Sequence, residues 1–581
     1  MKLSLLYGLL IGSFALAQND YLEPNKDYLW TTKPTTPLPY GAPWGDKTAD
    51  SDPNPPFTGV IRRYNWTVAR GVKAPDGYEK EGLFVNGQLP GPPIEANWGD
   101  TIEVTIHNAI YGPEDGTAIH WHGITQKGTV WQDGIPGVQQ CPIVPGKSFT
   151  YTFIADQYGT SWWHSHYAAQ YADGLYGPMI IHGPKHVEYD IDKGPVIISD
   201  YFHATGEELS ELSVSDDIDE VVAFSNNNLI NGRNSLHCYR TGPNDTTPCV
   251  PNAGVSKFRF SPGKRHLLRL INAGGDGQQK FSIDGHELTI ISTDFVRIKP
   301  YTVKTLTVGI GQRFDVIVKG LRNTTDAYTM RSTLASCSDA YQPNATAIVY
   351  YSHKNLVSNS KPWPELEQSL GYCGNDDIAL SVPWYPMKSF EPSTTDTMLF
   401  DVARNASGNY LWVVNNSAFR GNYNLPVLLL SNQGNNSYPY SPDWNVYDYG
   451  KNASIRLILR NPGFAVHPMH LHGHNFQIVA AGPGEWDGHT IVNPDNPIRR
   501  DTVLIPAASY AVIQFEADNP GTWPFHCHIA GHVAGGLYVN IFERTDEIAK
   551  IHIPAIIEQT CRDYEAWQAA GNVVNQVDSG V

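Results

Sequence analysis

The stretch Gly521-Thr522-Trp523-Pro524-Phe525-His526-Cys527-His528 aligns without a gap on Gly159-Thr160-Ser161-Trp162-Trp163-His164-Ser165-His166. Both stretches begin with Gly-Thr and carry a His-x-His pair at the end. Self-similarity of this kind indicates repeated structural units within one chain. We therefore expect the first and last parts of the chain to be closely related domains.

A second pattern occurs three times along the chain. In each copy, three residues at alternate positions precede an asparagine by the same step of two. The copies are Ile102, Val104, Ile106 and Asn108; His266, Leu268, Leu270 and Asn272; and Ile455, Leu457, Leu459 and Asn461. All the alternating residues are apolar except His266. This alternation is typical of half-buried β-strands. A chain of 581 residues is also too long for one hydrophobic core. The sequence thus predicts three related β domains.

The predicted boundaries follow these repeats. We expect a signal peptide at 1–17, an N-terminal arm at 18–56, domains at 57–183, 184–355 and 356–559, the last with a preceding linker, and a C-terminal tail at 560–581. The middle repeat, around Asp326–Ser332, has no His-x-His pair. We expect it to act as a spacer or substrate wall.

Histidines are concentrated in four short clusters that hold ten of the 21 in the chain: His120 and His122; His164 and His166; His467, His470 and His472; His526, His528 and His532. Residues i and i+2 of a strand point to one face, so each His-x-His pair can present two imidazoles to one metal. One pair alone is a weak signal. Four pairs, two in each related domain, predict a metal cluster with eight histidine ligands.

Cys527 is the residue that joins this cluster to a second site. The seven cysteines leave one thiol unpaired, and in a strand its sulfur faces away from the flanking His526 and His528. A thiolate with two imidazoles, here Cys527, His467 and His532, is the trigonal set that favours copper. Zinc is the alternative, but it does not explain eight further histidines.

These motifs resemble a known family. The runs HWHG (120–123), HSH (164–166), HPMHLHGH (467–474) and HCHIAGHVAGGL (526–537) are similar to the copper signatures of multicopper oxidases, and most of all to those of ascomycete laccases. The resemblance covers nearly the whole chain after the first apolar run. It implies an all-β protein of three cupredoxin-like Greek-key β-barrel or sandwich domains in tandem, with four coppers per chain.

The resemblance also implies a role for each ligand. His467, Cys527 and His532 would bind a type 1 copper, and His120 and His470 a type 2 copper. Two type 3 coppers would be held by His122, His164 and His528, and by His166, His472 and His526. Leu537 stands at the axial position, where it cannot ligate, and His474 is expected to be structural.

Two acidic residues, the other cysteines and the chain end match the family as well. Asp133 in WQDG and Asp518 in DNPG match acidic residues that lie near the cluster, so proton delivery is the predicted role, with turn capping as the alternative.

The disulfides that the resemblance implies are Cys141–Cys561 and Cys337–Cys373, which leaves Cys238 with Cys249. The final Asp578-Ser579-Gly580-Val581 resembles a C-terminal plug of a channel to the trinuclear site, the alternative being a disordered tail.

The function implied is a laccase-like oxidase that takes single electrons from phenolic or related aromatic donors and reduces dioxygen to water. Alternatives are a dedicated biosynthetic phenol-coupling oxidase, a ferroxidase, and a copper carrier without oxidase turnover. Gly531 replaces the tryptophan usual before the second type 1 histidine, which predicts a roomier pocket. Around Asn252 to Lys257 we find no acidic residue to accept the phenolic proton; Asp245 and His237 are the nearest substitutes.

The N-terminus and the surface chemistry predict a secreted glycoprotein of the extracellular space or cell wall. Lys2, the apolar run Leu3–Leu16 and the small residues around it resemble a signal peptide. Sequons occur at Asn65, Asn244, Asn323, Asn344, Asn405, Asn415, Asn435 and Asn452. The net charge of −17 argues against nucleic acid and anionic membranes as partners. We expect a monomer.

Overall fold

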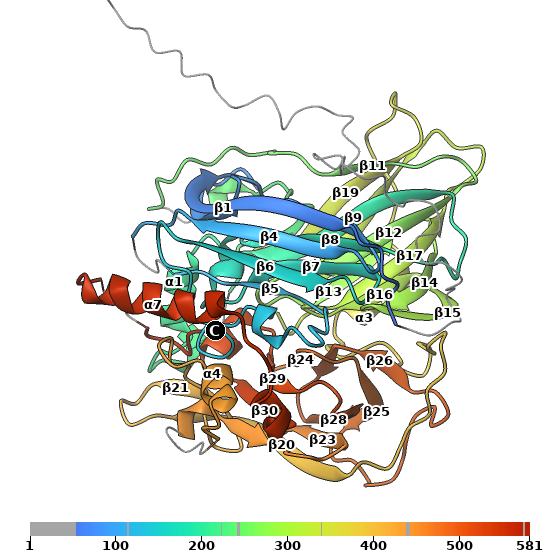
Figure 1. Ribbon diagram of the computed structural model, residues 1–581. Helices are drawn as coiled ribbons and strands as arrows, with labels where there is room; N and C mark the ends of the chain where they lie inside the picture. The colour runs from blue at the N-terminus through green and yellow to red at the C-terminus, as the bar shows by residue number, and fades with distance from the viewer. Residues whose placement is uncertain are drawn as a thin grey trace, which may run out of the picture.

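The computed structural model describes residues 54–581 except 113–115, 222–223, 241–243, 339, 437–441 and 573–575. The predicted signal peptide and most of the predicted N-terminal arm lie outside the described residues. The described chain is mostly β, as predicted, and its strands form three pairs of facing sheets. Figure 1 shows the blue-to-cyan strands of the first pair and the green-to-yellow strands of the second above the orange-to-red third.

The first sandwich has sheets ordered β2-β1-β4-β6 and β3-β8-β7-β5. Its elements are β1 (Ile61–Lys73), β2 (Lys80–Val85), β3 (Ile94–Asn97), β4 (Thr101–Asn108), β5 (Ile119–Trp121), η1 (Val130–Gln132), β6 (Ser148–Ile154), β7 (Gly159–Ser165), η2 (Gln170–Asp173) and β8 (Tyr176–His182). Strands β5 and β7 pair antiparallel, with His120 opposite His164. Two of the histidine clusters therefore lie on adjacent strands.

The second sandwich has sheets ordered β10-β9-β12-β17-β14-β15 and β11-β19-β18-β13-β16. Its elements are β9 (Ile191–Tyr201), α1 (Gly206–Leu212), α2 (Ile218–Val221), β10 (Asn227–Ile230), η3 (Cys238–Arg240), β11 (Lys257–Arg259), β12 (Arg265–Asn272), β13 (Gln279–Ile283), β14 (Leu288–Thr293), β15 (Val296–Val303), β16 (Thr305–Val308), β17 (Arg313–Lys319), β18 (Ala327–Leu334) and β19 (Asn344–Tyr350).

The third sandwich has sheets ordered β21-β20-β23-β28-β25-β26 and β22-β30-β29-β24-β27. Its elements, with the helices around it, are α3 (Pro364–Ser369), β20 (Thr394–Arg404), β21 (Tyr410–Val414), α4 (Val427–Asn432), η4 (Pro442–Trp444), β22 (Val446–Asp448), β23 (Ser454–Asn461), β24 (His467–Leu471), β25 (Phe476–Pro483), β26 (Ile498–Arg500), β27 (Thr502–Ile505), β28 (Ser509–Glu516), β29 (Gly521–Cys527), α5 (Ala530–Ala534), β30 (Tyr538–Glu543), α6 (Thr545–Ile548) and α7 (Ala555–Ala569).

The three predicted repeats are the strands β4, β12 and β23. Each pairs parallel with the first strand of its sandwich and antiparallel with a later strand. The shared asparagines end these strands in the same way, because each side-chain oxygen accepts the backbone N–H two residues on: Asn108 from Ile110 at 2.8 Å, Asn272 from Gly274 at 3.0 Å and Asn461 from Gly463 at 3.1 Å. A local Asx turn is a favoured use of asparagine.

The domain boundaries drawn from the sequence stay predictions. The three sandwiches run from β1 to β8, from β9 to β19 and from β20 to β30. The expected C-terminal tail at 560–581 begins within α7, which starts at Ala555. That helix lies against the first sandwich, and Cys561 on it bonds Cys141. Among the described residues, no helix is long and apolar enough to cross a membrane.

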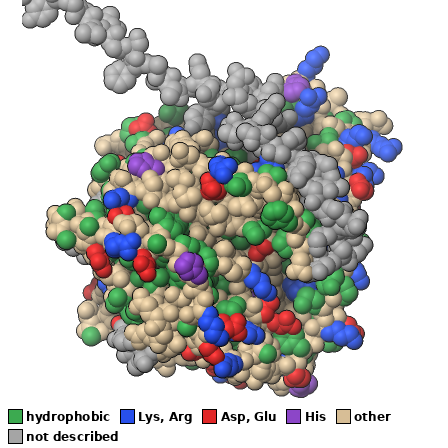
Figure 2. All heavy atoms as spheres, viewed as in Figure 1, with side chains coloured by type: hydrophobic (Ala, Val, Ile, Leu, Met, Phe, Trp, Pro, Cys, Tyr) green, Lys and Arg blue, Asp and Glu red, His purple; other side chains and the backbone are tan. Residues whose placement is uncertain are grey.

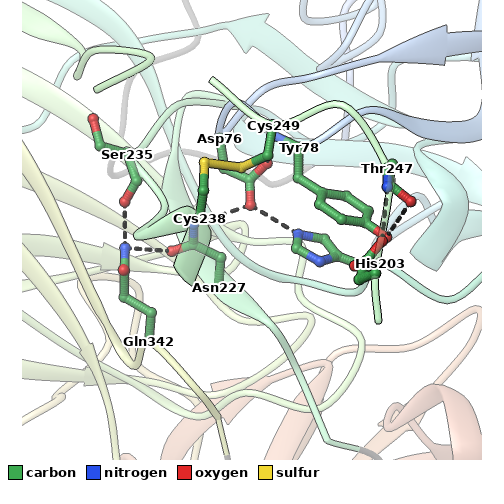
Figure 3. The surroundings of a disulfide bond; sticks show 10 residues. Asp76, Tyr78, His203, Asn227, Ser235, Cys238, Thr247, Cys249 and Gln342 are labelled. Atoms are coloured by element: carbon green, nitrogen blue, oxygen red, sulfur yellow. Dashed lines mark hydrogen bonds and ion pairs between the residues drawn. A yellow bond between two sulfur atoms is a disulfide. The ribbon is translucent and has the colours of Figure 1, made fainter. Parts of the chain in front are cut away.

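Three disulfides join the cysteines in the predicted pairs, Cys141–Cys561, Cys238–Cys249 and Cys337–Cys373, and Cys527 alone is free. Beside Cys238–Cys249, the ring of His203 stacks on Tyr78 at 3.8 Å and its Nε2 lies 3.0 Å from Asp76 Oδ2 (Figure 3). Tyr78 Oη also donates to Thr247 Oγ1 at 3.0 Å, which attaches the disulfide loop to the segment between β1 and β2 of the first sandwich. Asp245, in the same loop, accepts the backbone N–H of Thr247 at 2.9 Å, so its contacts are those of a turn residue.

Candidate metal centre

Ten histidines and one cysteine from the predicted clusters form two neighbouring groups, one within the third sandwich and one between the first and third sandwiches. All eleven side chains are buried, and the face of the molecule in Figure 2 shows only scattered histidines. Strand β5 and the turn after it carry His120 and His122, β7 and its end carry His164 and His166, β24 and its end carry His467, His470 and His472, and β29 with α5 carries His526, Cys527, His528 and His532. The pleat of each strand places the two histidines of a pair on one face.

One group consists of His467, Cys527 and His532, whose ligand atoms lie within 4.8 Å of one another. The Sγ atom of Cys527 is 3.6 Å from His467 Nδ1 and 3.4 Å from His532 Nδ1, and the two Nδ1 atoms are 3.1 Å apart. The site thus offers one sulfur and two nitrogens facing a common point. Leu537 is fully buried in the same hydrophobic core as Cys527 and offers no ligand atom.

The other eight histidines form a second, larger group. His166, His472 and His526 face one another, with Nε2 atoms 3.3 Å (His166 to His526) and 3.0 Å (His472 to His526) apart. The ligand atom of His120 lies within 4.8 Å of those of His122 and His164. It also lies within 4.8 Å of those of His470 and His472. His528 lies at the edge, with its ring 5.2 Å from that of His122 and 5.1 Å from that of His164.

The hydrogen bonds of these rings fit a metal site. In four of the rings, Nδ1–H donates to a backbone carbonyl oxygen. These bonds run from His120 to Asp133 O, from His164 to Ser165 O, from His470 to Asp501 O and from His526 to Cys527 O. The Nε2 atoms of His120, His164, His470 and His528 are buried without a partner, as is Nδ1 of His122. Such outer bonds fix the tautomer that leaves the inner nitrogen free for a metal.

Electrostatics supports the same conclusion. Burial lowers the pKa of His467 to about 3 and of His526 to about 3, and lowers the pKa of the other cluster histidines whose shifts are resolved. These imidazoles are therefore neutral ligands at ordinary pH. Burial also raises the pKa of the Cys527 thiol above its usual value, so a bound cation is needed to hold it as the thiolate.

The two predicted acidic residues lie in different surroundings. Asp133 is buried, with Oδ2 2.9 Å from His472 Nδ1 and Oδ1 3.2 Å from His120 Nδ1. Burial raises the pKa of Asp133, while His120 beside it acts in the opposite direction. Asp518 is 54% exposed and pairs with Lys127 Nζ at 2.6 Å. In the part of the chain that the structure describes, its ion-pair partner is Lys127, and it bonds none of the ten cluster histidines.

His474 lies next to the cluster but bonds outward. Its Nε2 is 3.1 Å from Glu543 Oε1, and its Nδ1 donates to the backbone oxygen of His472.

The first sandwich has no metal-binding set at the positions that correspond to Cys527 and His532, which are Ser165 and Gln170. There Ser165 Oγ donates to Gln170 Oε1 at 2.8 Å, and the Gln170 amide donates to Gly116 O. Hydrogen bonds replace the thiolate and imidazole of the third sandwich.

The sequence did not single out Asp501 or the contacts that Arg313 and Gly311 of the second sandwich make beside the histidine cluster. Asp501 Oδ1 is 3.3 Å from His122 Nε2, and Arg313 from β17 bonds both of its oxygens at 2.7 and 2.6 Å. A Cβ at Gly311 would lie 3.1 Å from ring carbons of His122 and His528. The run Arg499-Arg500-Asp501 before the apolar strand β27 was the available signal, because buried charges need partners.

The predicted open space at Gly531 is absent. Gly531 is buried in α5, and a Cβ there would lie 3.7 Å from Ser213 Cβ and 3.9 Å from Val221 O. The segment that includes α1 and α2 therefore covers the position where a tryptophan was expected. His532 is 8% exposed, and the ring of Trp412 lies 4.1 Å from its ring.

Comparison with protein families gives one consistent result. Three models described as multicopper oxidase match residues 67–186, 192–354 and 396–547. Each match covers the main part of one sandwich.

Characterised relatives align over most of their length. They include oxidoreductase OpS5 of Beauveria bassiana (36% identity, 93% of this chain and 91% of the relative), laccase-2 of Botryotinia fuckeliana (36%, 93% and 92%) and dihydrogeodin oxidase of Aspergillus terreus (32%, 93% and 93%). The crystal structure of a laccase from Botrytis aclada superposes with a TM-score of 0.82 at 33% identity, over 93% of this chain and 98% of that one.

Proposed function

The chain belongs to the multicopper oxidase family, close to fungal laccases, and from that premise we propose a laccase-like function. The protein would couple one-electron oxidation of phenolic or related aromatic donors to the four-electron reduction of dioxygen to water. The observation that carries this proposal is that Cys527 of the first group is bonded along the chain to His526 and His528 of the second. Two sites joined in this way suit an enzyme that collects electrons at one and uses them at the other.

Copper is the cofactor that the family implies, and the donor set fits it. We propose four coppers per chain, with His467, Cys527 and His532 at a type 1 site, His120 and His470 at a type 2 site, and the remaining six cluster histidines at a type 3 pair. Bound copper would supply reversible one-electron chemistry. The protein residues hold the ligands neutral, exclude bulk water and keep the two groups at a fixed separation.

Proton supply is the second task of the protein. Asp133 is the better-placed candidate, because its carboxylate bonds His472 and lies beside His120. Asp518 lies at the surface with Lys127 in a cavity of about 490 Å³ that His474 also lines. We propose that Asp133 delivers protons at the cluster and that Asp518 receives them from solvent.

A dedicated biosynthetic oxidase is the second candidate. The wall that α1 and α2 form over Gly531 favours a defined donor over many bulky ones, and the relatives include both a laccase and a dihydrogeodin oxidase. Oxygen uptake with a panel of phenols, non-phenolic donors and ferrous iron tests the proposal. Uptake with several simple phenols supports the laccase-like function; uptake with one polycyclic phenol alone supports the biosynthetic role; uptake with iron alone contradicts both.

We also propose secretion and N-glycosylation. Six of the eight sequon asparagines are exposed, Asn65, Asn244, Asn323, Asn344, Asn405 and Asn415, and the other two are half-buried. Exposed asparagines are accessible to glycosyl transfer. Glycopeptide mass spectrometry of the protein from culture medium tests both points, and unmodified sequons throughout would contradict the proposal.

A further inference from the structure

The last residues of the chain are buried against α5. Asp578, Ser579 and Val581 are each less than 5% exposed. Ser579 makes two hydrogen bonds to the end of α5: its N–H donates to Ala534 O at 2.8 Å, and its Oγ–H donates to Val533 O at 2.7 Å. Figure 1 marks the chain end between the cyan and the orange parts of the molecule.

Helix α5 needs such external contacts. It spans only Ala530–Ala534, and a helix of this length is not stable by itself. The carbonyls of its last turn have no partner within the helix. Ala534 O accepts from Ser579 N, and Val533 O accepts both from Gly536 N, in the turn that ends the helix, and from Ser579 Oγ. A Cβ at Gly531 would lie 3.7 Å from Cβ of Ser213, at the end of α1. Helix α5 is therefore held by the tail and lies close to the end of α1.

The same helix carries His532. Its Nδ1 is 3.4 Å from Cys527 Sγ, and its backbone oxygen accepts from Leu537 N at 3.0 Å, while Leu537 O accepts from Cys527 N at 3.0 Å. Any shift of α5 changes the distance between the imidazole and the sulfur directly. No flexible linker separates the Ser579 contacts, at Val533 and Ala534, from His532.

The outer side of the tail is held by the segment 420–423. Arg420 donates to the backbone oxygens of Gln576 and, at 3.3 Å, of Asp578. Gly421 N donates to Ser579 O at 2.9 Å, and Tyr423 Oη donates to Gly580 O at 2.8 Å. The tail is thus clamped between this segment and α5.

We propose that Ser579 is a positioning residue for the group of His467, Cys527 and His532. By fixing the end of α5, the tail sets the geometry with which His532 meets the metal beside Cys527. This inference rests on the proposed function, because it takes the group to hold a type 1 copper. The chain end would then support the site where electrons enter. This role is separate from that of a plug in the channel to the trinuclear site.

The test uses the full-length, copper-loaded protein with Ser579→Ala. We expect the blue thiolate absorption and the copper hyperfine splitting in the EPR spectrum to shift, and the type 1 copper to be lost several-fold faster to a chelator. Ser579→Thr, which keeps the hydroxyl donor, should restore the native spectrum. Ser332→Ala is the matched control, because Ser332 is buried in the second sandwich and bonds Gln279. This substitution also removes a buried hydrogen bond, and we expect it to leave the spectrum unchanged.

Arg420→Ala covers the case in which Ser579→Ala fails to fold. Arg420 is exposed, so the protein should fold, and loosening the outer clamp should shift the same spectral features in the same direction. Native spectra and native copper retention in every soluble variant would overturn the proposal. If the unaltered protein shows no blue absorption, the proposed function fails instead, so the two failures are distinguishable.

Discussion

Asp133 Oδ2 accepts a hydrogen bond from His472 Nδ1 at 2.9 Å, across a sequence separation of 339 residues. The contact joins the loop after η1 in the first sandwich to the end of β24 in the third. Because Nδ1 of His472 carries the proton, its Nε2 is left to face His526 at 3.0 Å. One carboxylate thus orients a ligand and holds the two sandwiches together.

Asp133→Asn should weaken this orientation. An amide oxygen is a weaker acceptor than a carboxylate, so we expect copper affinity or turnover to fall by about 10- to 100-fold. Metal analysis and oxygen uptake measure both. Asp284→Asn is the control, since Asp284 is equally buried but pairs with Arg331 in the second sandwich; a native copper content and rate in Asp133→Asn would contradict the role.

Cys527→Ser should abolish the blue absorption and donor oxidation. Serine offers no soft thiolate for a type 1 copper, while the eight cluster histidines remain. We expect fewer coppers per chain and no oxygen uptake. A variant that keeps both the blue colour and turnover would rule out the assignment of Cys527.

His120→Ala should leave the blue absorption in place and stop oxygen reduction. His120 lies among the cluster histidines and not beside Cys527, so only the larger group loses a ligand. Reduced protein mixed with oxygen should stay reduced. His107→Ala, which removes a half-buried histidine bonded to Ser148 outside the cluster, should reoxidise normally; equal behaviour of the two variants would refute the mapping.

Comparing Asp518→Asn with Lys127→Met shows whether Asp518 supplies protons or only forms a surface ion pair. Asp518 and Lys127 are both more than half exposed, so the pair should contribute no more than about 1 kcal/mol to stability. If Asp518 supplies protons, Asp518→Asn lowers the oxygen-reduction rate and Lys127→Met does not. Equal, small effects of both changes on turnover would assign Asp518 a structural role only.

The copper-free protein should lose stability in acid. The folded pKa of His467 and of His526 is about 3, below the value of about 6.5 expected for unfolded histidine. Between these values the unfolded chain binds more protons, so stability falls as pH falls, by about 1.4 kcal/mol per pH unit for each such group. Melting temperatures of the copper-free protein from pH 7 to 4 test this; a constant or rising value in acid would contradict it.

The repeated patterns of the sequence predicted the elements well. The alternating residues before Asn108, Asn272 and Asn461 form equivalent strands, and the paired histidines lie on strands or at their ends. These features depend on local geometry, which the period of two in a strand makes visible. The disulfide pairs, which the family resemblance implied, were also confirmed.

Gly531 and Asp501 show where local patterns are insufficient. The absence of a side chain at Gly531 predicted open space, but the segment around α1 and α2 fills it. Asp501 gave only the signal of a charged run before an apolar strand, which does not identify its partners, yet it contacts His122 from the first sandwich and Arg313 from the second. Neither neighbour is near in sequence, so no window along the chain contains the information.

The sequence by itself determined the strands, their threefold repetition and the set of residues able to bind metal, because those follow from side-chain chemistry and the alternation along each strand. Only the tertiary structure decided which residues surround that set: Asp133 beside His472, Arg313 with Asp501, and Ser579 on α5. The reason is physical. A buried donor or acceptor must find a partner in space, and packing the three sandwiches together selects that partner from any part of the chain.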